Sequence, residues 1–333
     1  MADNSRKFVW PSIGQERAAA FLEKSALAGK LAQTYIFAGP RDLGKASLAL
    51  AFARNLWCYD RGEEIPGRGD FSSLDSDLYI LEREPEKKQI SVEQARAFSQ
   101  RLGLSSFLNS YKIGLVKEAE RLSPEAQSAL LKTLEEPREK VIIILLAENI
   151  DSLLPTIVSR SQVLYFYPVA AAAVYDYLLS DSGLKRSLAK ELAAASLGRP
   201  LQAKKWAEDE AGYQEHSALV RQLFDFLNSD LPSRLDMISA AGSGNNLSAE
   251  TALAWIEIWE SLWRDALLSV LNQEDRLQYP NLLGDWQAWR GSGSGEDRLR
   301  QALSGLQQLK QARTYVQGSV NPKNVLESLA IYF

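Results

Sequence analysis

The segment 39–46 reads Gly-Pro-Arg-Asp-Leu-Gly-Lys-Ala and nearly fits the phosphate-binding pattern G-x-x-x-x-G-K-[ST]. In that pattern the glycines let backbone N–H groups wrap a phosphate, and the lysine pairs with the terminal phosphates. Gly39, Gly44 and Lys45 are therefore the candidate phosphate-binding residues. A β-branched and aromatic run precedes the loop at 34–38 and a helical pattern follows it, which is the strand–loop–helix context that such a site needs.

The metal-binding half of this pattern is missing. Ala46 stands where a Ser or Thr hydroxyl would bind Mg²⁺, and Ser47, one residue later, points about 100° away on a helix. Lys117 follows the apolar run 113–116, where a metal-organising aspartate is expected, whereas Glu118 keeps the place of the water-activating carboxylate. Two unit charges about 4 Å apart interact by roughly 4 kcal/mol at an effective dielectric of about 20, so the lysine replaces attraction for the cation by a similar repulsion. We expect the hydrolytic site to be inactive.

Composition excludes several classes of function. The chain has 333 residues, of which 46% are hydrophobic and 24% are charged, as in a soluble globular protein of two or three domains. Its formal net charge of −4 argues against a chain that binds nucleic acid on its own by neutralising phosphates. The N-terminus lacks the apolar core of a secretory signal, and the apolar run 141–147 is too short for a bilayer. We expect a cytoplasmic protein that does not contact a membrane.

The sequence contains one cysteine and one histidine, Cys58 and His216. They can form neither an internal disulfide nor the four-ligand shell of a structural zinc, so no metal site is expected. Cys58 is interpreted as a buried bystander and His216 as a solvated helix residue in a polar stretch.

The first half of the chain has the pattern of a parallel α/β domain. Ser91 and Gln94 form a capping box that starts one helix, and another helix begins at Ser123-Pro124 and should end near Glu136, before Pro137. Between the helices lie continuous apolar runs that suit strands covered on both faces, at 34–38, 78–81, 113–116 and 141–146.

Strand signals vanish after about Pro168. Residues 170–207 indicate a small helical unit with a break at 198–200, and the chain is helical again from about 208. Trp255, Trp259 and Trp263 recur every four residues and so share one helix stripe, for which core packing or a subunit interface is favoured over base stacking. Two turn-rich loops interrupt the helical pattern, at 242–246 and 291–295.

Several motifs together resemble the clamp-loader branch of the AAA+ proteins. They are the phosphate loop, the segment 112–122, and the segment 123–137, whose end Ala-Leu-Leu-Lys-Thr-Leu-Glu-Glu-Pro is close to a signature of that branch. The segment 153–162 is similar to the Ser-Arg-Cys motif, with Ser161 in place of the cysteine, and 320–329 looks like the end of the collar domain. The resemblance is strongest over 91–162.

The resemblance implies an AAA+ domain over 1–167, a helical lid over 168–207 and a helical collar over 208–333. It implies that Arg160, with Ser159, is an arginine finger that acts on the ATP site of a neighbouring subunit. Without the surrounding motif, an ordinary salt bridge would be the favoured interpretation of Arg160. Arg199 falls where the lid carries a second sensor arginine, and it is either a remnant or a tie between lid and core.

Two departures from the family pattern bear on cofactors. Members with a zinc module carry four cysteines after the loop helix, whereas the segment 58–69 has Cys58 alone. The segment 145–149 lacks the threonine that is common at the first sensor. We expect no cofactor and no metal, although residual nucleotide affinity stays open.

The favoured hypothesis is a non-catalytic subunit of a bacterial clamp loader in DNA replication, because the ATP motifs are degraded while the finger motif persists. Its expected partners are the γ/τ and δ subunits in a pentameric ring, with the sliding clamp and primer-template DNA reached through the complex. The alternatives are a self-sufficient AAA+ ATPase with an unusual metal site, a nucleotide-binding adaptor without hydrolysis, and an interaction scaffold outside replication.

Overall fold

The computed structural model describes residues 8–11, 13–65, 77–106, 110–135, 138–242, 247–318 and 320–333. The chain divides into two compact units. Unit 1 comprises Met1–Tyr177 with Gly198–Gln202, and unit 2 comprises Leu178–Leu197 with Ala203–Phe333. The division passes through α6 (Ala171–Ser182) and α8 (Pro200–Glu208), so each unit takes part of the predicted lid.

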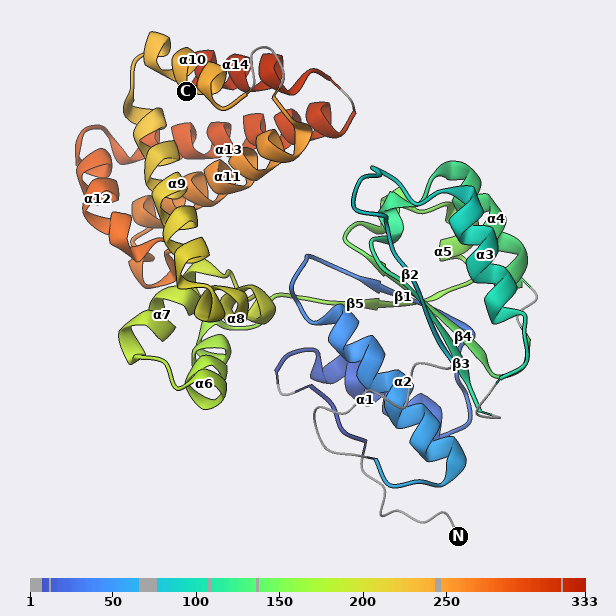
Figure 1. Ribbon diagram of the computed structural model, residues 1–333. Coiled ribbons are helices and arrows are strands. Elements are labelled where there is room, and N and C mark those ends of the chain that lie inside the picture. The colour runs from blue at the N-terminus through green and yellow to red at the C-terminus, as the bar shows by residue number, and fades with distance from the viewer. Residues whose placement is uncertain are drawn as a thin grey trace. The chain divides into compact units, whose positions relative to one another are not determined.

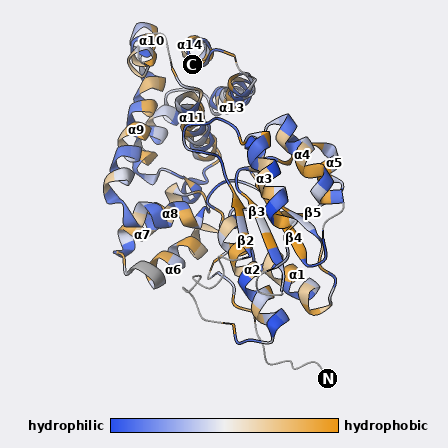
Figure 2. Ribbon diagram, turned by 45° about the vertical axis from the view of Figure 1, so that its right-hand side comes forward, coloured by the Kyte–Doolittle hydropathy of each residue, from blue (hydrophilic) through white to orange (hydrophobic). Residues whose placement is uncertain are grey.

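Unit 1 is built on a five-stranded parallel sheet (Figure 1). Every residue of β1, β3 and β4 is buried, as their largely apolar sequences predict, and β4, whose residues are all hydrophobic, is orange in Figure 2. The sheet confirms the predicted α/β class and adds an edge strand, β5, that the apolar pattern did not indicate. Across the sheet the strands are β2 (Leu78–Leu81), β3 (Lys112–Val116), β4 (Val141–Ala147), β1 (Thr34–Ala38) and β5 (Gln162–Tyr165).

Helices cover both faces of this sheet. Phe37 packs in a core cluster with residues of α1 (Glu16–Leu27) and α2 (Lys45–Arg61). Its neighbour Ile36 points to the opposite face, because side chains alternate along a strand. That face is covered by three helices, α3 (Val92–Leu102), α4 (Pro124–Glu135) and α5 (Pro155–Val158), with the short 3₁₀ helices η1 (Ala119–Arg121) and η2 (Ile150–Ser152) between strands and helices.

The predicted helix starts in unit 1 are confirmed. The Ser91 hydroxyl accepts a hydrogen bond from the Gln94 N–H at 3.4 Å, and the Gln94 side chain accepts one from the Ser91 N–H at 3.0 Å. The Ser123 hydroxyl likewise accepts from the Ala126 N–H at 3.1 Å, at the start of α4. The predicted stop at Glu136 and Pro137 lies outside the described residues, and the last described residue of α4 is Glu135.

Unit 2 is helical throughout its described residues. Trp255, Trp259 and Trp263 lie in α11 with exposed fractions of 5%, 0% and 4%, which confirms that they pack in the core. Gly305 lets α13 approach this stripe, since a Cβ there would lie 2.8 Å from Trp263. The helices are α7 (Arg186–Ala195), α9 (Glu210–Asn228), α10 (Leu231–Ala240), α11 (Ala249–Val270), α12 (Leu283–Gly291), α13 (Gly295–Gln317) and α14 (Pro322–Tyr332), with η3 (Glu274–Arg276) and η4 (Pro280–Leu282).

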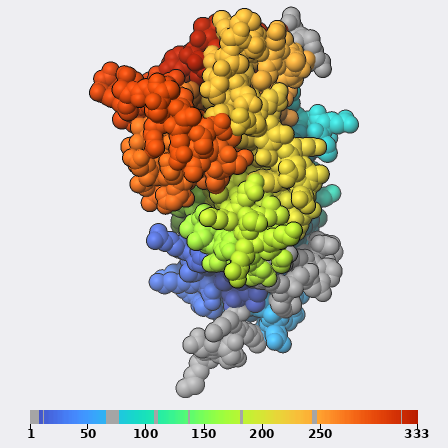
Figure 3. Space-filling view, turned by 90° about the vertical axis from the view of Figure 1, so that its left-hand side faces the viewer, coloured from blue at the N-terminus to red at the C-terminus, as the bar shows by residue number. Residues whose placement is uncertain are grey.

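His216 lies in a helix, α9, as predicted, but it is not fully solvated. Its ring is partly buried and lies 4.8 Å from the ring of Trp206, centroid to centroid, with Tyr279 on another side at 6.3 Å. Next to it, the Tyr213 hydroxyl donates a hydrogen bond to Glu191 at 2.8 Å and so joins α9 to α7. Figure 3 shows the yellow-green residues of this region in direct contact with the yellow residues of α9. The polar residues next to His216 in the sequence did not indicate that it packs against aromatic rings from other segments, those of Trp206 and Tyr279.

Of the two predicted turn-rich loops, the structure describes one fully and the other only in part. Residues 292–294 separate α12 from α13, as the glycine–serine pattern predicted, whereas 243–246 of the other loop lie outside the described residues. Cys58, the one cysteine of the sequence, is buried, as predicted. Within the described ranges, no helix combines the length and the apolar character needed to cross a membrane.

Candidate nucleotide loop and arginine finger

The loop between β1 and α2 has the backbone of a phosphate loop. Gly39 has a φ of 145° and Gly44 one of 86°, and both values favour glycine. A Cβ at Gly39 would also lie 2.3 Å from the carbonyl oxygen of Phe166, the residue that follows β5. The two glycines of the pattern are therefore required by the loop's own geometry, whether or not a phosphate binds.

Lys45 is folded back onto its own loop. Its Nζ donates hydrogen bonds to the backbone carbonyls of Gly39 and Pro40, the latter at 2.8 Å. Burial lowers the pKa of Lys45, and the nearby carboxylates of Glu148 and Glu120 partly oppose this shift. The ammonium that would pair with phosphates is thus held by carbonyl groups of the same chain.

Glu118 lies at the same edge of the sheet, but its carboxylate is paired with two arginines. Arg41 of the phosphate loop approaches it at 3.5 Å and Arg83 at 3.6 Å. Lys117, at the position expected for the aspartate, pairs instead with Glu82 at 2.7 Å. Cations therefore surround the carboxylate that would serve a metal-bound water.

Residues that the sequence did not single out complete this charged edge. Arg41 forms an ion pair with Glu148, which directly follows β4. The Glu148 N–H donates to the Glu120 carboxylate at 3.3 Å, and burial raises the pKa of Glu120. Asn149, the last residue of the segment 145–149, accepts a hydrogen bond from the Asp151 N–H at 2.9 Å and caps η2.

These residues do not fit a magnesium–nucleotide. Ala46 has no oxygen ligand, Lys117 repels a cation, and Glu118 already has two arginine partners. Among the residues that the structure describes, no group of three or more His, Cys, Asp and Glu side chains could hold a metal ion.

The segment that carries Arg199 contacts the phosphate loop through its backbone. The Leu201 N–H, at the start of α8, donates to the Asp42 carbonyl at 3.1 Å. Gly198, with a φ of 72°, accepts from the Val169 N–H at 2.9 Å. Arg199 itself is half-buried, and its role as a sensor stays a prediction.

Arg160 lies at the edge of the sheet where the strands begin, opposite the edge where they end and where the phosphate loop lies. It precedes β5, whereas the phosphate loop follows β1, and parallel strands place these two ends on opposite edges. Its guanidinium pairs with Glu135 at 3.0 Å, donates to the Thr156 carbonyl at 3.1 Å and keeps 40% of the side chain exposed. Ser159 donates to the same carbonyl at 3.1 Å. The structure therefore separates Arg160 from Lys45, so it cannot serve the chain's own loop.

A buried glutamine supports the segment that presents Arg160. Gln127 of α4, 6% exposed, accepts a hydrogen bond from the Leu154 N–H at 2.8 Å and donates to the Ser152 carbonyl at 3.2 Å. Both bonds hold the chain directly before α5. No local pattern indicated this role, although Gln127 lies within the segment 123–137 that resembles the family.

The comparisons with known proteins agree with these motifs. The family described as "DNA polymerase III, delta subunit" matches residues 14–170. The chain is 23% identical to the DNA polymerase III subunit delta′ of Bacillus subtilis (strain 168) over 95% of both chains. It is 33% identical to the subunit delta′ of Yersinia pestis over 67% of this chain and 66% of that relative.

A solved structure, the DNA polymerase III gamma subunit-related protein of Thermotoga maritima, matches over 95% of this chain and 97% of that one, with 20% identity and a TM-score of 0.47. The Bacillus subtilis delta′ subunit matches the chain nearly end to end, and the matched family covers the sheet that carries both the phosphate loop and Arg160. The chain belongs to the delta-prime clamp-loader family of DNA polymerase III subunits.

Proposed function

We propose that the chain completes the ATP site of a neighbouring γ/τ subunit in the clamp loader and runs no ATP chemistry of its own. One observation carries the proposal. Arg160 is exposed at the sheet edge that faces away from the chain's own loop, whereas the charged groups of that loop pair with one another.

The chemistry of Arg160 suits this role. A guanidinium is planar and permanently charged, and it can stabilise the charge that develops on a transferring γ-phosphoryl group. Two of its N–H groups are held by Glu135 and the Thr156 carbonyl, which leaves other donors for a phosphate. Ser159 and Gln127 position the short segment around it.

The chain's own loop is proposed to be inactive and to need no ATP, Mg²⁺ or zinc. The Lys45–carbonyl bonds and the Arg41–Glu118 pair support this view. A nucleotide-binding adaptor is the second candidate, because Gly39, Gly44 and Lys45 keep the loop backbone.

The assembly follows from the same proposal. The chain would join γ/τ and δ subunits in a pentameric ring in the cytoplasm and reach the sliding clamp and primer-template DNA through that ring. Three functional parts are proposed, with the AAA+ domain over 1–167, the lid over 168–207 and the collar over 208–333. The helical core of unit 2 supports the collar assignment.

The finger is tested by Arg160→Ala in a reconstituted loader in which only the γ/τ subunit next to this chain keeps an active loop. Single-turnover ATP hydrolysis should fall by about 10³-fold or more. Arg17→Ala, at an exposed position of α1, is the matched control and should change nothing. Unaltered ATP hydrolysis with Arg160→Ala would contradict the assignment of Arg160 as an arginine finger.

The loop is tested separately by titration calorimetry of the purified chain with ATP and Mg²⁺, followed by an ATPase assay. We expect no binding up to millimolar nucleotide. Micromolar binding without turnover would favour the adaptor, and binding with turnover would favour the self-sufficient ATPase.

A further inference from the structure

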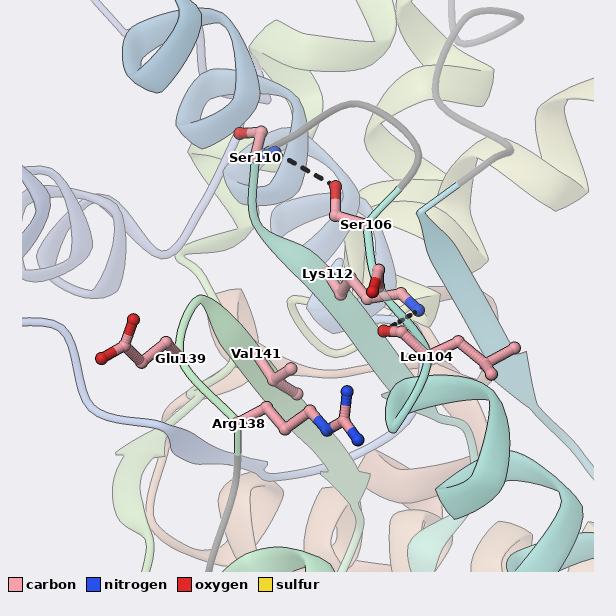
Figure 4. A pocket seen from close by; sticks show the side chains of 8 residues that line it. Leu104, Ser106, Ser110, Lys112, Arg138, Glu139 and Val141 are labelled. Atoms are coloured by element: carbon pink, nitrogen blue, oxygen red, sulfur yellow. Dashed lines mark hydrogen bonds between the residues drawn. The ribbon is translucent and has the colours of Figure 1, made fainter.

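A pocket of about 350 Å³ opens in unit 1 at the edge of the sheet where β3 and β4 begin (Figure 4). Leu104 and Ser105, between α3 and β3, line one side, and Lys112, Arg138 and Val141 line others. The nucleotide loop lies at the other edge of the same parallel sheet, so this pocket belongs to neither the loop nor its charged network.

Lys112 gives the wall a positive charge but has its hydrogen bonds satisfied. It is 2% exposed, and its Nζ donates to the carbonyls of Arg101 at 2.8 Å and Leu104 at 2.9 Å. These carbonyls lie at and just after the C-terminus of α3, where a cation is favourable. The ammonium also lies 4.9 Å from the ring centre of Tyr79. Lys112 is thus a structural cap that also contributes positive potential.

Among the described residues, no side chain or backbone group forms a hydrogen bond or an ion pair with the side chain of Arg138. The side chain is exposed, whereas the backbone carbonyl of Arg138 accepts a hydrogen bond from the Val141 N–H at 3.2 Å. Figure 4 shows its guanidinium directed toward Leu104 and Lys112, while Glu139 points away. Leu104, 60% exposed, adds an apolar rim. A free guanidinium beside an aliphatic rim suits a carboxylate that is flanked by an apolar side chain.

The pocket lies at the same edge of the sheet as Arg160, the edge where the strands begin. Glu135, the ion-pair partner of Arg160, precedes Arg138 by only three residues. The strands β4 and β5 both begin at this edge with β1 alone between them, which sets them about 10 Å apart. A protein that covers Arg160 would therefore reach Arg138 as well.

We propose that this pocket receives an acidic side chain, flanked by an apolar residue, from the neighbouring subunit that Arg160 serves. The inference rests on the proposed function and adds a second contact to it. A protein carboxylate fits better than a nucleic-acid backbone, because a guanidinium beside an aliphatic rim does not provide the series of cations that successive phosphates require.

Arg138→Glu tests the pocket, with Arg17→Glu on α1 as the matched charge reversal elsewhere in unit 1. The measurement is the affinity of each variant for the γ/τ partner at about 0.1 M and about 0.5 M salt, together with single-turnover hydrolysis at saturating partner. Arg138→Glu should weaken binding about tenfold at low salt and less at high salt, with hydrolysis at saturation unchanged. Leu104→Ser should weaken binding about threefold, and Arg17→Glu should have no effect.

The outcomes separate the two proposals. If a folded Arg138→Glu chain binds the γ/τ partner with unchanged affinity, the proposal that the pocket is a docking contact is overturned, whatever the result with Arg160→Ala. Loss of primer-template DNA binding with normal subunit affinity would also overturn it, in favour of a nucleic-acid contact. Unchanged ATP hydrolysis with Arg160→Ala would contradict the finger assignment. A lower affinity of Arg138→Glu for the γ/τ partner would then still support the docking contact.

Discussion

The two edges of the sheet in unit 1 carry similar arginines and use them in opposite ways. At the edge where the strands end, Arg41 and Arg83 both lie within 3.6 Å of Glu118, and Arg41 also pairs with Glu148. At the edge where the strands begin, Arg160 has one carboxylate partner, Glu135, and 40% of its side chain is exposed, compared with 55% for Arg41. The edges differ in their pairing rather than in exposure: at the first, which we call the inward edge, Arg41 joins two carboxylates of the same chain, and at the second, the outward edge, Arg160 has a single one.

Under the proposed function, this difference would let one fold lose its own ATP chemistry and keep a role in another subunit's site. The outward edge depends on the bonds of Gln127 to the segment before α5, and none of those bonds involves the phosphate loop. Ala46 and Lys117 can therefore remove the metal site without disturbing the support of Arg160.

The largest effect that would sharpen the comparison is expected from Arg160→Lys. An ammonium keeps the charge but loses the planar fork of donors, so hydrolysis at the neighbouring site should fall by about 10³-fold, or about 4 kcal/mol. Single-turnover hydrolysis in the reconstituted loader measures it, with Lys24→Arg on α1 as a control. A lysine that restored full activity would mean that charge alone suffices.

At the inward edge, Gly39→Ala should destabilise the chain by about 3 kcal/mol, because a positive φ and contact with the Phe166 carbonyl both oppose a side chain. Gly29→Ala is the matched control, since Gly29 also has a positive φ but nothing within 4 Å of its Cβ, and it should cost about 1 kcal/mol. Urea unfolding measures both. Equal losses would show that the loop is not fixed against the residue after β5.

Burial explains which parts of this contrast the sequence could predict. The strands β1, β3 and β4 are covered on both faces and so appear as continuous apolar runs, whereas β5 begins and ends with the exposed residues Gln162 and Tyr165. Gly39, Gly44, Lys45 and Arg160 belong to short sequence motifs and could therefore be singled out from the sequence. The Arg41–Glu148 pair joins residues 107 positions apart, and no local pattern encodes it.

Unit 2 provides a reference for a fully buried carboxylate, Asp265, whose one ion-pair partner is the adjacent Arg264 at 3.4 Å. Asp265 is 0% exposed and accepts hydrogen bonds from the N–H groups of Gln278 and Tyr279, each at 2.9 Å. Burial raises the pKa of Asp265 from 3.8 to about 6. Between these values the folded state binds more protons than the unfolded state, so the free energy of unfolding should decrease as the pH rises from about 4 to 6.

The Asp265 contribution amounts to about 3 kcal/mol over that interval. Urea unfolding at several pH values should show the decrease in the wild-type chain, and Asp265→Asn should remove it, since an amide does not titrate. An identical pH dependence in both chains would contradict the assignment.

The smallest effect is expected from Glu135→Gln, which removes the ion pair of Arg160 but leaves its bond to the Thr156 carbonyl. Both side chains of the pair are at least 40% exposed, so the free energy of unfolding should change by less than about 1 kcal/mol. Hydrolysis at the neighbouring site should fall only about two- to fivefold, because one of two anchors remains. A loss as large as that of Arg160→Ala would mean that the outward edge, like the inward one, depends on ion pairing within the chain.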